Sequence, residues 1–535
     1  MDTFKVLVAD DLSTRGVEIL RSSKKIDVDV KVGLKPAELL QIIRNYDALV
    51  VRSATKVTAE VLEAGTRLKI VGRAGIGVDN IDVKAASRRG VIVENTPSGN
   101  AVTTAEHALS LLLSLARKIP QATASMKAGK WEKKKFQGVE LLDKEMGVIG
   151  LGNIGRIVAD RACGLKMKVI AYDPFISKEA AASLGAELVT LDELLSRADF
   201  ISVHTPLTPD TRGLINEAAF AKMKPGVLVI NAARGEIVDE AALVKALESG
   251  KLGGAALDVF AKEPPDPSSP TVLHEKVICT PHLGASTDEA QEKVAIEVAE
   301  QIVAFVDRGE VKNAVNIAPV RPEVLPRLQP WMDLAAKLGS LIGQVHPREG
   351  GIEELEVEVI GEVADYGVSP VGRAALAGLL RTFLDVPVNE VNAPIIAGER
   401  GLRVVEVKRH QGVNFSAAVG LRTRGASATR YVQGTIFRVG DQHEPRIVQI
   451  DDFVLDAAPE GRILFIQNAD RPGVIGHVGT VLGQKGINVA RLHVGLDKTK
   501  GTSVQLWNVD AELPSALLEE IRRQPNIVSA QQVTL

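Results

Sequence analysis

Short apolar runs alternate with amphipathic stretches along the first part of the chain. The runs have the length of buried strands, and the stretches between them repeat apolar residues at the spacing of a helix. Strands are predicted at Phe4–Ala9, Ala48–Val51 and Lys69–Val71, and helices at Pro36–Arg44 and Thr58–Ala64. Residues 1–98 are therefore expected to form a small parallel α/β domain.

A second and longer series of the same kind occupies residues 99–285. Its later strands are predicted at Phe200–His204, Val227–Asn231, Ala255–Val259 and Val277–Cys279. Short apolar runs of this kind suit a parallel sheet that is covered on both faces. The helical pattern from Asp288 to about Arg308 can return the chain to the first domain. Residues 286–316 are therefore expected to complete that domain, with the active site in the cleft between the two domains.

Four prolines within a short stretch mark the next boundary and are typical of a linker: Pro319, Pro322, Pro326 and Pro330. Residues 317–458 combine a predicted helix at Gly372–Leu384 with strands, including a hairpin over Gly434–Ile450. They are expected to form an intervening α+β domain. No catalytic grouping stands out there, and His443 and Arg430 are interpreted as surface residues.

The tail, residues 459–535, follows the order strand, helix, strand, strand, helix, strand. The strands are predicted at Ile463–Ile466, Val489–Val494, Ser503–Val509 and Ile527–Val533, and the helices at Pro472–Gln484 and Pro514–Arg523. This is the order of a ferredoxin-like domain. The expected fold class is thus α/β, with two Rossmann-like parallel-sheet domains flanking a cleft, an intervening α+β domain and a ferredoxin-like domain at the C-terminus.

Composition narrows the function more than the fold. The chain has 535 residues, and its 64 basic and 67 acidic side chains give no reason to expect nucleic acid or an anionic membrane as the main partner. The two cysteines, Cys163 and Cys279, fit a reducing compartment and make neither a disulfide framework nor a metal site. The N-terminus shows no targeting signal, and no apolar run reaches the ~18 residues of a membrane span. A cytoplasmic location is expected.

A glycine turn lies between a predicted strand and a predicted helix. Gly150, Gly152 and Gly155 follow the apolar run Met146–Ile149, and a second strand ends at Asp173. Glycines let the backbone approach a pyrophosphate, which the free N–H groups of a helix start can hold. A carboxylate at the position of Asp173 bonds ribose hydroxyls and repels a 2′-phosphate. The pattern therefore predicts NAD as the cofactor.

Three charged residues follow later strands of the same series: Arg234, Glu263 and His282. Histidine suits the transfer of a hydroxyl proton because its pKa lies near neutrality, and a carboxylate partner fixes its tautomer. Arginine can bind a substrate carboxylate through two N–H groups. Each residue taken singly has an ordinary alternative, as a loop histidine, a turn glutamate or a helix-capping arginine. Three other histidines compete with His282: His107, His204 and His274.

Several segments resemble the D-isomer-specific 2-hydroxyacid dehydrogenases, namely Gly150–Gly155, Asn231–Glu240, Ala255–Phe260 with Glu263–Pro265, and Pro281–Ala285. Three more are similar to the long-form members of that family that act on D-3-phosphoglycerate: Val51–Lys56, Val71–Asn80 and Gln121–Trp131. The resemblance covers the whole chain. It implies a dehydrogenase core to about residue 316, an intervening domain, and an ACT-type regulatory domain at residues 459–535.

The resemblance also implies a role for each matching position. His282 would be the acid/base, Glu263 its orienting partner and Arg234 the clamp on the substrate carboxylate. NAD would be bound by Gly150, Gly152, Asn153, Ile154, Gly155, Asp173, Thr205, Ala232, Asp258 and Gly284. The substrate would face Arg52, Ser53, Arg73, Gly75 and Asn100. No metal ion is expected. The implied reaction is the NAD-dependent oxidation of D-3-phosphoglycerate to 3-phosphohydroxypyruvate, the first step of L-serine biosynthesis.

Two further segments suggest a partner or an effector. The clearest charge cluster is either a solvated face or, as the family implies, a segment near a dimer contact that can attract a substrate phosphate: Lys127, Lys130, Lys133, Lys134 and Lys135. In the tail, Asn468–Gly473 resembles the ligand loop of ACT domains. L-serine is the expected feedback inhibitor, with Asn468, Asp470 and Asn488 as its ligands, and the alternative is a pairing module that binds nothing. The family suggests a homotetramer.

Two other functions stay open at this point. One is a 2-hydroxyacid dehydrogenase that acts on glyoxylate, 2-oxoglutarate or another acid. The other is a dinucleotide-sensing interaction protein, like the transcriptional corepressors built on the same core. Such corepressors bind partner peptides and need no amino-acid sensor, so the ACT-like tail argues against that reading.

Overall fold

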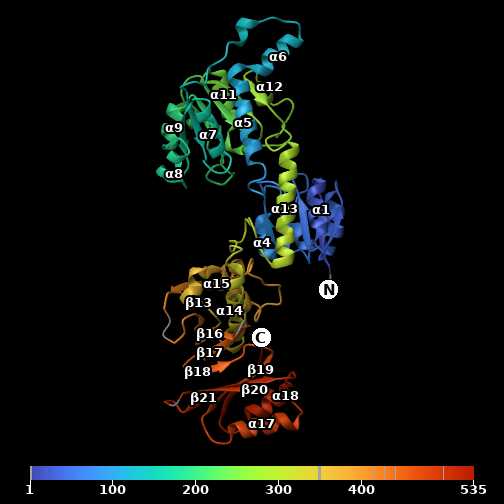
Figure 1. Cartoon of the computed structure of the whole chain (residues 1–535), viewed down its shortest axis with the longest axis vertical. Helices are drawn as coiled ribbons and strands as arrows, with labels where there is room; N and C mark the ends of the chain where they lie inside the picture. Colours follow the sequence, from blue (N-terminus) through green and yellow to red (C-terminus); the bar gives the residue numbers. More distant parts are fainter. Residues whose placement is uncertain (1–2, 348–350, 412–413, 427, 440–441, 498) are drawn as a thin grey trace.

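The computed structural model describes residues 3–347, 351–411, 414–426, 428–439, 442–497 and 499–535. These residues form four units, each built on one sheet, which follow one another along the long axis of the molecule (Figure 1). The second unit lies at one end, next to the first, and the third and fourth units follow beyond the first. Helix α13 (Asp288–Arg308) makes this order possible because it brings the chain back from the second unit to the first.

The first unit is a five-stranded parallel sheet with helices on both faces. Its order is β2 (Ile26–Val30), β1 (Phe4–Val8), β3 (Ala48–Val51), β4 (Ile70–Arg73) and β5 (Ile92–Glu94). Successive residues of β1 enter different cores, because Val6 and Val8 pack with α1 and α13 whereas Leu7 packs on the other face. A strand buried on both faces therefore reads as a continuous apolar run. The remaining helices are α1 (Thr14–Ser22), α2 (Pro36–Ile42), α3 (Ala59–Ala64) and α4 (Val83–Arg89).

The second unit is a seven-stranded sheet, and every pairing in it is parallel. Its order is β12 (Val277–Cys279), β11 (Leu252–Leu257), β10 (Val227–Asn231), β9 (Phe200–Val203), β6 (Glu145–Ile149), β7 (Lys168–Tyr172) and β8 (Ala186–Leu188). The chain starts this sheet at β6 and later returns to the other side of β6 with β9. Ligands of open α/β sheets bind where the strand order reverses in this way.

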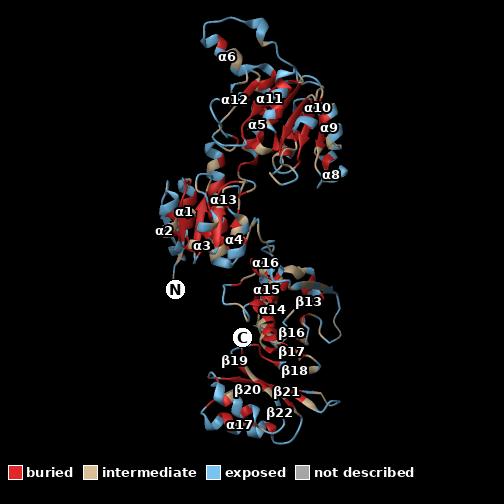
Figure 2. Ribbon diagram, turned by 180° about the vertical axis from the view of Figure 1, so that it is seen from behind, coloured by how far each residue is buried: buried red, intermediate tan, exposed pale blue. Residues whose placement is uncertain are grey.

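Helices cover both faces of the second sheet, and Figure 2 shows its strands buried between them. One face packs against α5 (Ala101–Arg117), α7 (Gly155–Gly164) and α8 (Lys178–Ser183). The other packs against α9 (Leu191–Arg197), α10 (Glu217–Lys222) and α11 (Glu240–Glu248), and α12 (Pro270–Leu273) precedes β12.

An arm projects from the second unit on the side away from the first unit (Figure 1). It contains α6 (Ile119–Lys127) and the short 3-10 turn η2 (Lys133–Phe136). Its five clustered lysines are exposed, and Trp131 is 80% exposed. Within one chain the lysine cluster therefore lies on a solvated face.

The third unit is a six-stranded mixed sheet with long helices on one face. Its order is β14 (Arg403–Arg409), β13 (Glu354–Ile360), β15 (Ala418–Arg424), β16 (Thr429–Val439), β17 (Gln442–Ile450) and β18 (Phe453–Ala457). The helices are α14 (Leu325–Val345), α15 (Val368–Leu380) and α16 (Ala393–Glu399). The predicted hairpin is present as β16 and β17, whereas the predicted helix at Gly372–Leu384 begins and ends four residues earlier, as α15.

Two expectations for the third unit are wrong. Pro326 and Pro330 do not lie in a linker, because both belong to α14. The missing N–H of Pro326 costs little in the first turn of a helix, and the one bond lost at Pro330 is offset by the buried face that α14 packs against α15. Arg430 is not a surface residue either, since its side chain is 14% exposed and pairs with Asp451.

The fourth unit has the predicted ferredoxin-like order. Its sheet runs β20 (Val489–Asp497), β21 (Thr502–Val509), β19 (Arg462–Ala469) and β22 (Ile527–Thr534), with α17 (Val474–Gln484) and α18 (Ser515–Arg522) on one face. The opposite face shares a hydrophobic core with the third unit through Phe465 and Leu506. The predicted fold class is confirmed. Among the described helices, none is long and apolar enough to cross a membrane.

Candidate active site

The glycine turn joins the end of β6 to the start of α7. Gly150 has φ +93°, and a Cβ there would lie 2.8 Å from the carbonyl oxygen of His204. A Cβ on Gly155 would overlap the carbonyl oxygen of Gly150, whereas one on Gly152 would meet no atom within 4 Å. Two glycines are therefore needed for close packing, and the third leaves open space at the helix start, where a pyrophosphate fits.

Asp173 directly follows β7, beside this turn. Its Oδ2 accepts a 2.8 Å hydrogen bond from the backbone N–H of Leu151, and its Oδ1 accepts a 2.9 Å bond from the backbone N–H of Phe175. Next to it, Asn153 donates to the carbonyl oxygen of Pro97 at 3.3 Å, and Ile154 precedes α7 without a capping side chain. The first N–H groups of α7 thus lack a side-chain partner, which suits a bound phosphate.

Buried polar atoms without a hydrogen-bond partner in the described part of the chain include Thr205 Oγ1, Asn100 Oδ1 and Arg73 Nε. Leaving such an atom unpaired costs about 1–3 kcal/mol. Each belongs to a residue that the sequence assigned to the cofactor or the substrate. Together with the open glycine turn, these atoms fit a dinucleotide and a polar substrate.

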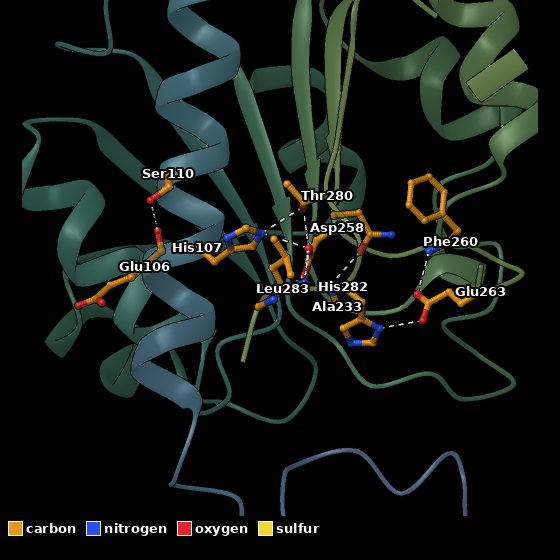
Figure 3. Close-up of polar contacts among 12 residues, drawn as sticks. Glu106, His107, Ser110, Ala233, Asp258, Phe260, Glu263, Thr280, His282 and Leu283 are labelled. Carbon is orange, nitrogen blue, oxygen red and sulfur yellow. Dashed lines mark hydrogen bonds and ion pairs between the residues drawn. The ribbon is translucent and has the colours of Figure 1, made fainter. Parts of the chain in front are cut away.

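His282 and Glu263 form a hydrogen-bonded pair beyond the ends of β12 and β11 (Figure 3). Nδ1 of His282 lies 2.8 Å from Oε2 of Glu263. The other carboxylate oxygen, Oε1, accepts a 3.1 Å bond from the backbone N–H of Phe260, which fixes the plane of the carboxylate. His282 has φ +55°, in the left-handed region that non-glycine residues rarely adopt. Nε2 of His282 remains available to a substrate.

Asp258 is buried behind this pair and holds the loop that carries His282 (Figure 3). Its carboxylate accepts bonds from the backbone N–H groups of Leu283, at 2.7 Å, and Gly284, at 2.8 Å. Thr280 Oγ1 donates to it at 2.6 Å, and Nε2 of His107 lies 3.1 Å away. Burial alone would raise the pKa of Asp258, but the bonds from His107, Thr280 and Leu283 hold it below its ordinary value. Asp258 is therefore ionised at neutral pH.

Arginines from both units meet beside the loop that follows β4. Arg234 donates from Nε and Nη2 to Oδ2 of Asp79, both at 2.8 Å. A Cβ on Gly77 would overlap the guanidinium of Arg234, and one on Gly75, whose φ is +141°, would overlap that of Arg73. The two glycines thus make room for two guanidinium groups. Burial, followed by the charges of Arg234 and Arg52, lowers the pKa of Arg73 to about 10. This concentration of positive charge favours an anionic ligand.

The remaining predicted residues differ in their exposure. Ser53 is exposed beside Arg52, and Ala232 is buried just after β10. Burial lowers the pKa of His204 to about 4, so its imidazole is neutral at pH 7 and is not a competing acid/base. The bond between Asp79 and Arg234 and the contact of His107 with Asp258 were not predicted, although Asp79 lies within the segment Val71–Asn80. Among the described residues, no group of three or more His, Cys, Asp and Glu could hold a metal ion.

The three predicted effector residues differ in their surroundings. Asp470 and Asn488 are exposed at the two ends of the segment that contains α17. Asn468 is 2% exposed, and its Oδ1 accepts bonds from Ser503 at 2.8 Å and Gln505 at 2.9 Å. Two of the three side chains are therefore free to meet a ligand.

Three family models match successive parts of the chain. Residues 109–284 match the D-isomer specific 2-hydroxyacid dehydrogenase NAD binding domain, residues 327–451 the D-3-phosphoglycerate dehydrogenase intervening domain, and residues 462–526 the ACT domain. The prediction of NAD as the cofactor is confirmed.

Relatives match over the whole chain. It is 46% identical to the D-3-phosphoglycerate dehydrogenase of Synechocystis over 99% of this chain and 95% of that protein. The corresponding enzyme of Archaeoglobus fulgidus is 44% identical over 99% of this chain and 100% of its own length.

Solved structures match the first two units. The TT0316 protein of Thermus thermophilus has a TM-score of 0.54 and 34% identity, over 58% of this chain and 100% of that one. The D-lactate dehydrogenase of Aquifex aeolicus, solved with NAD and lactic acid, has a TM-score of 0.52 and 28% identity, over 58% of this chain and 98% of that one.

Proposed function

The chain belongs to the D-3-phosphoglycerate dehydrogenases, and from that premise we propose that it oxidises D-3-phosphoglycerate to 3-phosphohydroxypyruvate with NAD, the first step of L-serine biosynthesis. The observation that carries the proposal is the 2.8 Å bond between His282 and Glu263 beyond the strand ends of the NAD-binding sheet. Bound NAD supplies the hydride acceptor for this reaction.

His282 is the group that moves the proton. A neutral His282 that donates its Nδ1 hydrogen to Glu263 keeps a lone pair on Nε2, which takes the proton of the C2 hydroxyl. The carboxylate of Glu263 stabilises the imidazolium that forms. In the reverse direction the same Nε2 returns the proton to the carbonyl oxygen.

Arginines hold the two anionic ends of the substrate. Arg234 is the proposed clamp on the substrate carboxylate. That carboxylate competes with Asp79 for the guanidinium of Arg234. Arg52 and Arg73 come from the first unit, and Asp79 and Asp10 offset part of the positive charge around Arg73. A substrate that carries both a carboxylate and a phosphate matches this excess of guanidinium groups.

The fourth unit is the proposed sensor of L-serine. Asp470 and Asn488 present exposed side chains, whereas Asn468 acts directly only if it breaks its bonds to Ser503 and Gln505. We further propose that the exposed arm around Trp131 contacts a second copy of the chain within a homotetramer, where its lysines reach the partner's substrate. The two unpaired cysteines suit a reducing cytoplasm.

The test is the initial rate of NADH formation with D-3-phosphoglycerate, measured against a panel of other 2-hydroxyacids and with added L-serine. We expect D-3-phosphoglycerate to give the highest kcat/KM and Arg73→Leu to raise its KM without abolishing NAD binding. A higher kcat/KM for glycolate or 2-hydroxyglutarate would overturn the substrate assignment. NAD binding without turnover of any acid would favour a sensing protein, and an unchanged rate with serine would leave the fourth unit a structural module.

A further inference from the structure

His107 lies on α5 and contacts Asp258 and Thr280, which lie next to the loop that carries His282 (the catalytic loop, residues 282–284). Its Nε2 is 3.1 Å from Asp258 Oδ1 and 3.1 Å from Thr280 Oγ1 (Figure 3). Its side chain is 19% exposed, whereas that of Asp258 is 1% exposed. No motif and no role in the proton transfer accounts for this second histidine–carboxylate contact.

The contacts fix the tautomer of His107. Thr280 gives its single hydroxyl hydrogen to Asp258, so its oxygen can only accept from His107. An ionised carboxylate also only accepts. Both neighbours of Nε2 are therefore acceptors, and Nε2 must carry a hydrogen that the two oxygens share.

Asp258 in turn holds the backbone of the catalytic loop at three successive residues. Its carbonyl oxygen accepts from the N–H of His282 at 2.8 Å, and its carboxylate accepts from the N–H groups of Leu283 and Gly284. The left-handed φ of His282 costs about 1–2 kcal/mol for a non-glycine residue and persists only where its surroundings impose it. These three bonds impose it.

Helix α5 connects this anchor to the substrate side of the site. The helix follows Asn100, a proposed substrate-facing residue, and His107 lies about two turns further along. The His107 side chain thus joins the loop that carries His282 to the helix that follows Asn100.

We propose that His107 is a positioning residue: its Nε2–H orients Asp258, and Asp258 holds His282 in the backbone conformation that presents the imidazole to the substrate. The proposal rests on the proposed function for its kinetic consequence. Its geometric part, the anchoring of residues 282–284, stands apart from the identity of the substrate.

Three substitutions of His107 separate the hydrogen bond from the volume of the side chain. His107→Leu removes the donor. In His107→Gln the amide nitrogen lies as many bonds from Cα as Nε2 does in histidine. In His107→Asn it lies only as far as Nδ1, so the asparagine side chain is too short to reach Asp258. His274→Leu is the matched control, because His274 is a half-buried histidine of the same unit whose side chain accepts a bond from the backbone N–H of Lys276.

The readouts are kcat and KM for the acid substrate, and hydrogen–deuterium exchange of the peptide 280–286. We expect His107→Leu and His107→Asn to lower kcat roughly 10- to 100-fold while KM changes less than about threefold, because small misplacement of a catalytic group costs this much. Exchange of the peptide should accelerate in both variants. His107→Gln and His274→Leu should resemble the wild type in both readouts.

Equal kcat and exchange in the glutamine and asparagine variants would overturn the proposal, and so would an unchanged His107→Leu protein. Should His107→Leu fail to fold, the comparison of glutamine with asparagine decides. If the wild type does not oxidise D-3-phosphoglycerate, the proposed function fails, while the exchange of the peptide still decides whether His107 anchors the loop.

Discussion

The NAD-binding unit holds two histidine–carboxylate pairs that differ chiefly in exposure. The side chains of His282 and Glu263 are 51% and 38% exposed, whereas those of His107 and Asp258 are 19% and 1% exposed. Glu263 receives one backbone bond besides its histidine, whereas Asp258 receives bonds from Thr280 and two backbone N–H groups. In the proposals above, the same two residue types serve chemistry where a substrate can reach them and hold the loop where it cannot.

The comparison teaches that a loss of activity alone does not distinguish the two pairs. Changes to the exposed pair remove the proposed proton-transfer group and leave few buried atoms unpaired. Changes to the buried pair leave several donors without a partner, so they affect the folded state as well. Kinetics and stability therefore have to be measured together at each pair.

The largest effect is expected at His282. His282→Asn removes the proton acceptor but keeps a side chain that tolerates the left-handed backbone, so kcat should fall between about 10²- and 10⁴-fold. NAD affinity and the thermal midpoint should stay close to the wild-type values because the side chain is half exposed. Initial rates, an NAD titration and calorimetry check this. A variant that keeps activity within tenfold would show that another group transfers the proton.

Asp258→Ala should give the largest loss of stability. It leaves Thr280, His107 and the N–H groups of Leu283 and Gly284 without their acceptor, which should cost about 3 kcal/mol or more. Calorimetry should show a lower midpoint for the second unit, which contains Asp258. Glu263→Ala is the matched control at the exposed pair and should leave that midpoint nearly unchanged. Equal midpoints for the two variants would remove the distinction between the pairs.

The sequence predicts the exposed pair better than the buried one, for a physical reason. Glu263 and His282 follow neighbouring parallel strands, so the rule that ligands bind at carboxyl strand ends brings them together. The glycine turn is likewise a local device. His107 comes from a helix, and its approach to Asp258 depends on how α5 packs on the sheet. Asp79 meets Arg234 only through the arrangement of two units, and the buried amide of Asn468 depends on its neighbours in the fourth sheet.

Glu263→Gln should change the tautomer of His282 without changing the stability of the folded protein. The N–H of Phe260 keeps an oxygen at the Oε1 position, so the new amide nitrogen faces His282 and donates to Nδ1. The proton of His282 then moves to Nε2, which can no longer act as a base. We expect kcat to fall about 10²-fold without a change in the thermal midpoint. A variant as active as the wild type would mean that Glu263 does not set the tautomer.

A third carboxyl, that of Glu94 at the end of β5, is buried like Asp258 and shows the effect of having fewer hydrogen-bond donors. It is 0% exposed, accepts one bond from the N–H of Lys312, and its Oε2 has no partner within the described residues. Burial raises the pKa of Glu94 to about 8, against the opposing bond from Lys312. Asp258, with several donors, has its pKa shifted in the opposite direction.

The last prediction is a pH dependence of stability at Glu94. Its folded pKa of about 8 lies above the ordinary 4.5, so its contribution is fully present below pH 4.5 and is lost as pH rises through 8. Glu94→Gln keeps the acceptor for Lys312 without the charge, so it should be more stable than the wild type at pH 8, by roughly 4 kcal/mol, and nearly equal to it near pH 4.5. Calorimetry across this window checks the prediction. A difference that does not grow with pH would mean that Glu94 is ionised in the folded protein, and that burial without donors does not suffice to keep a carboxyl neutral here.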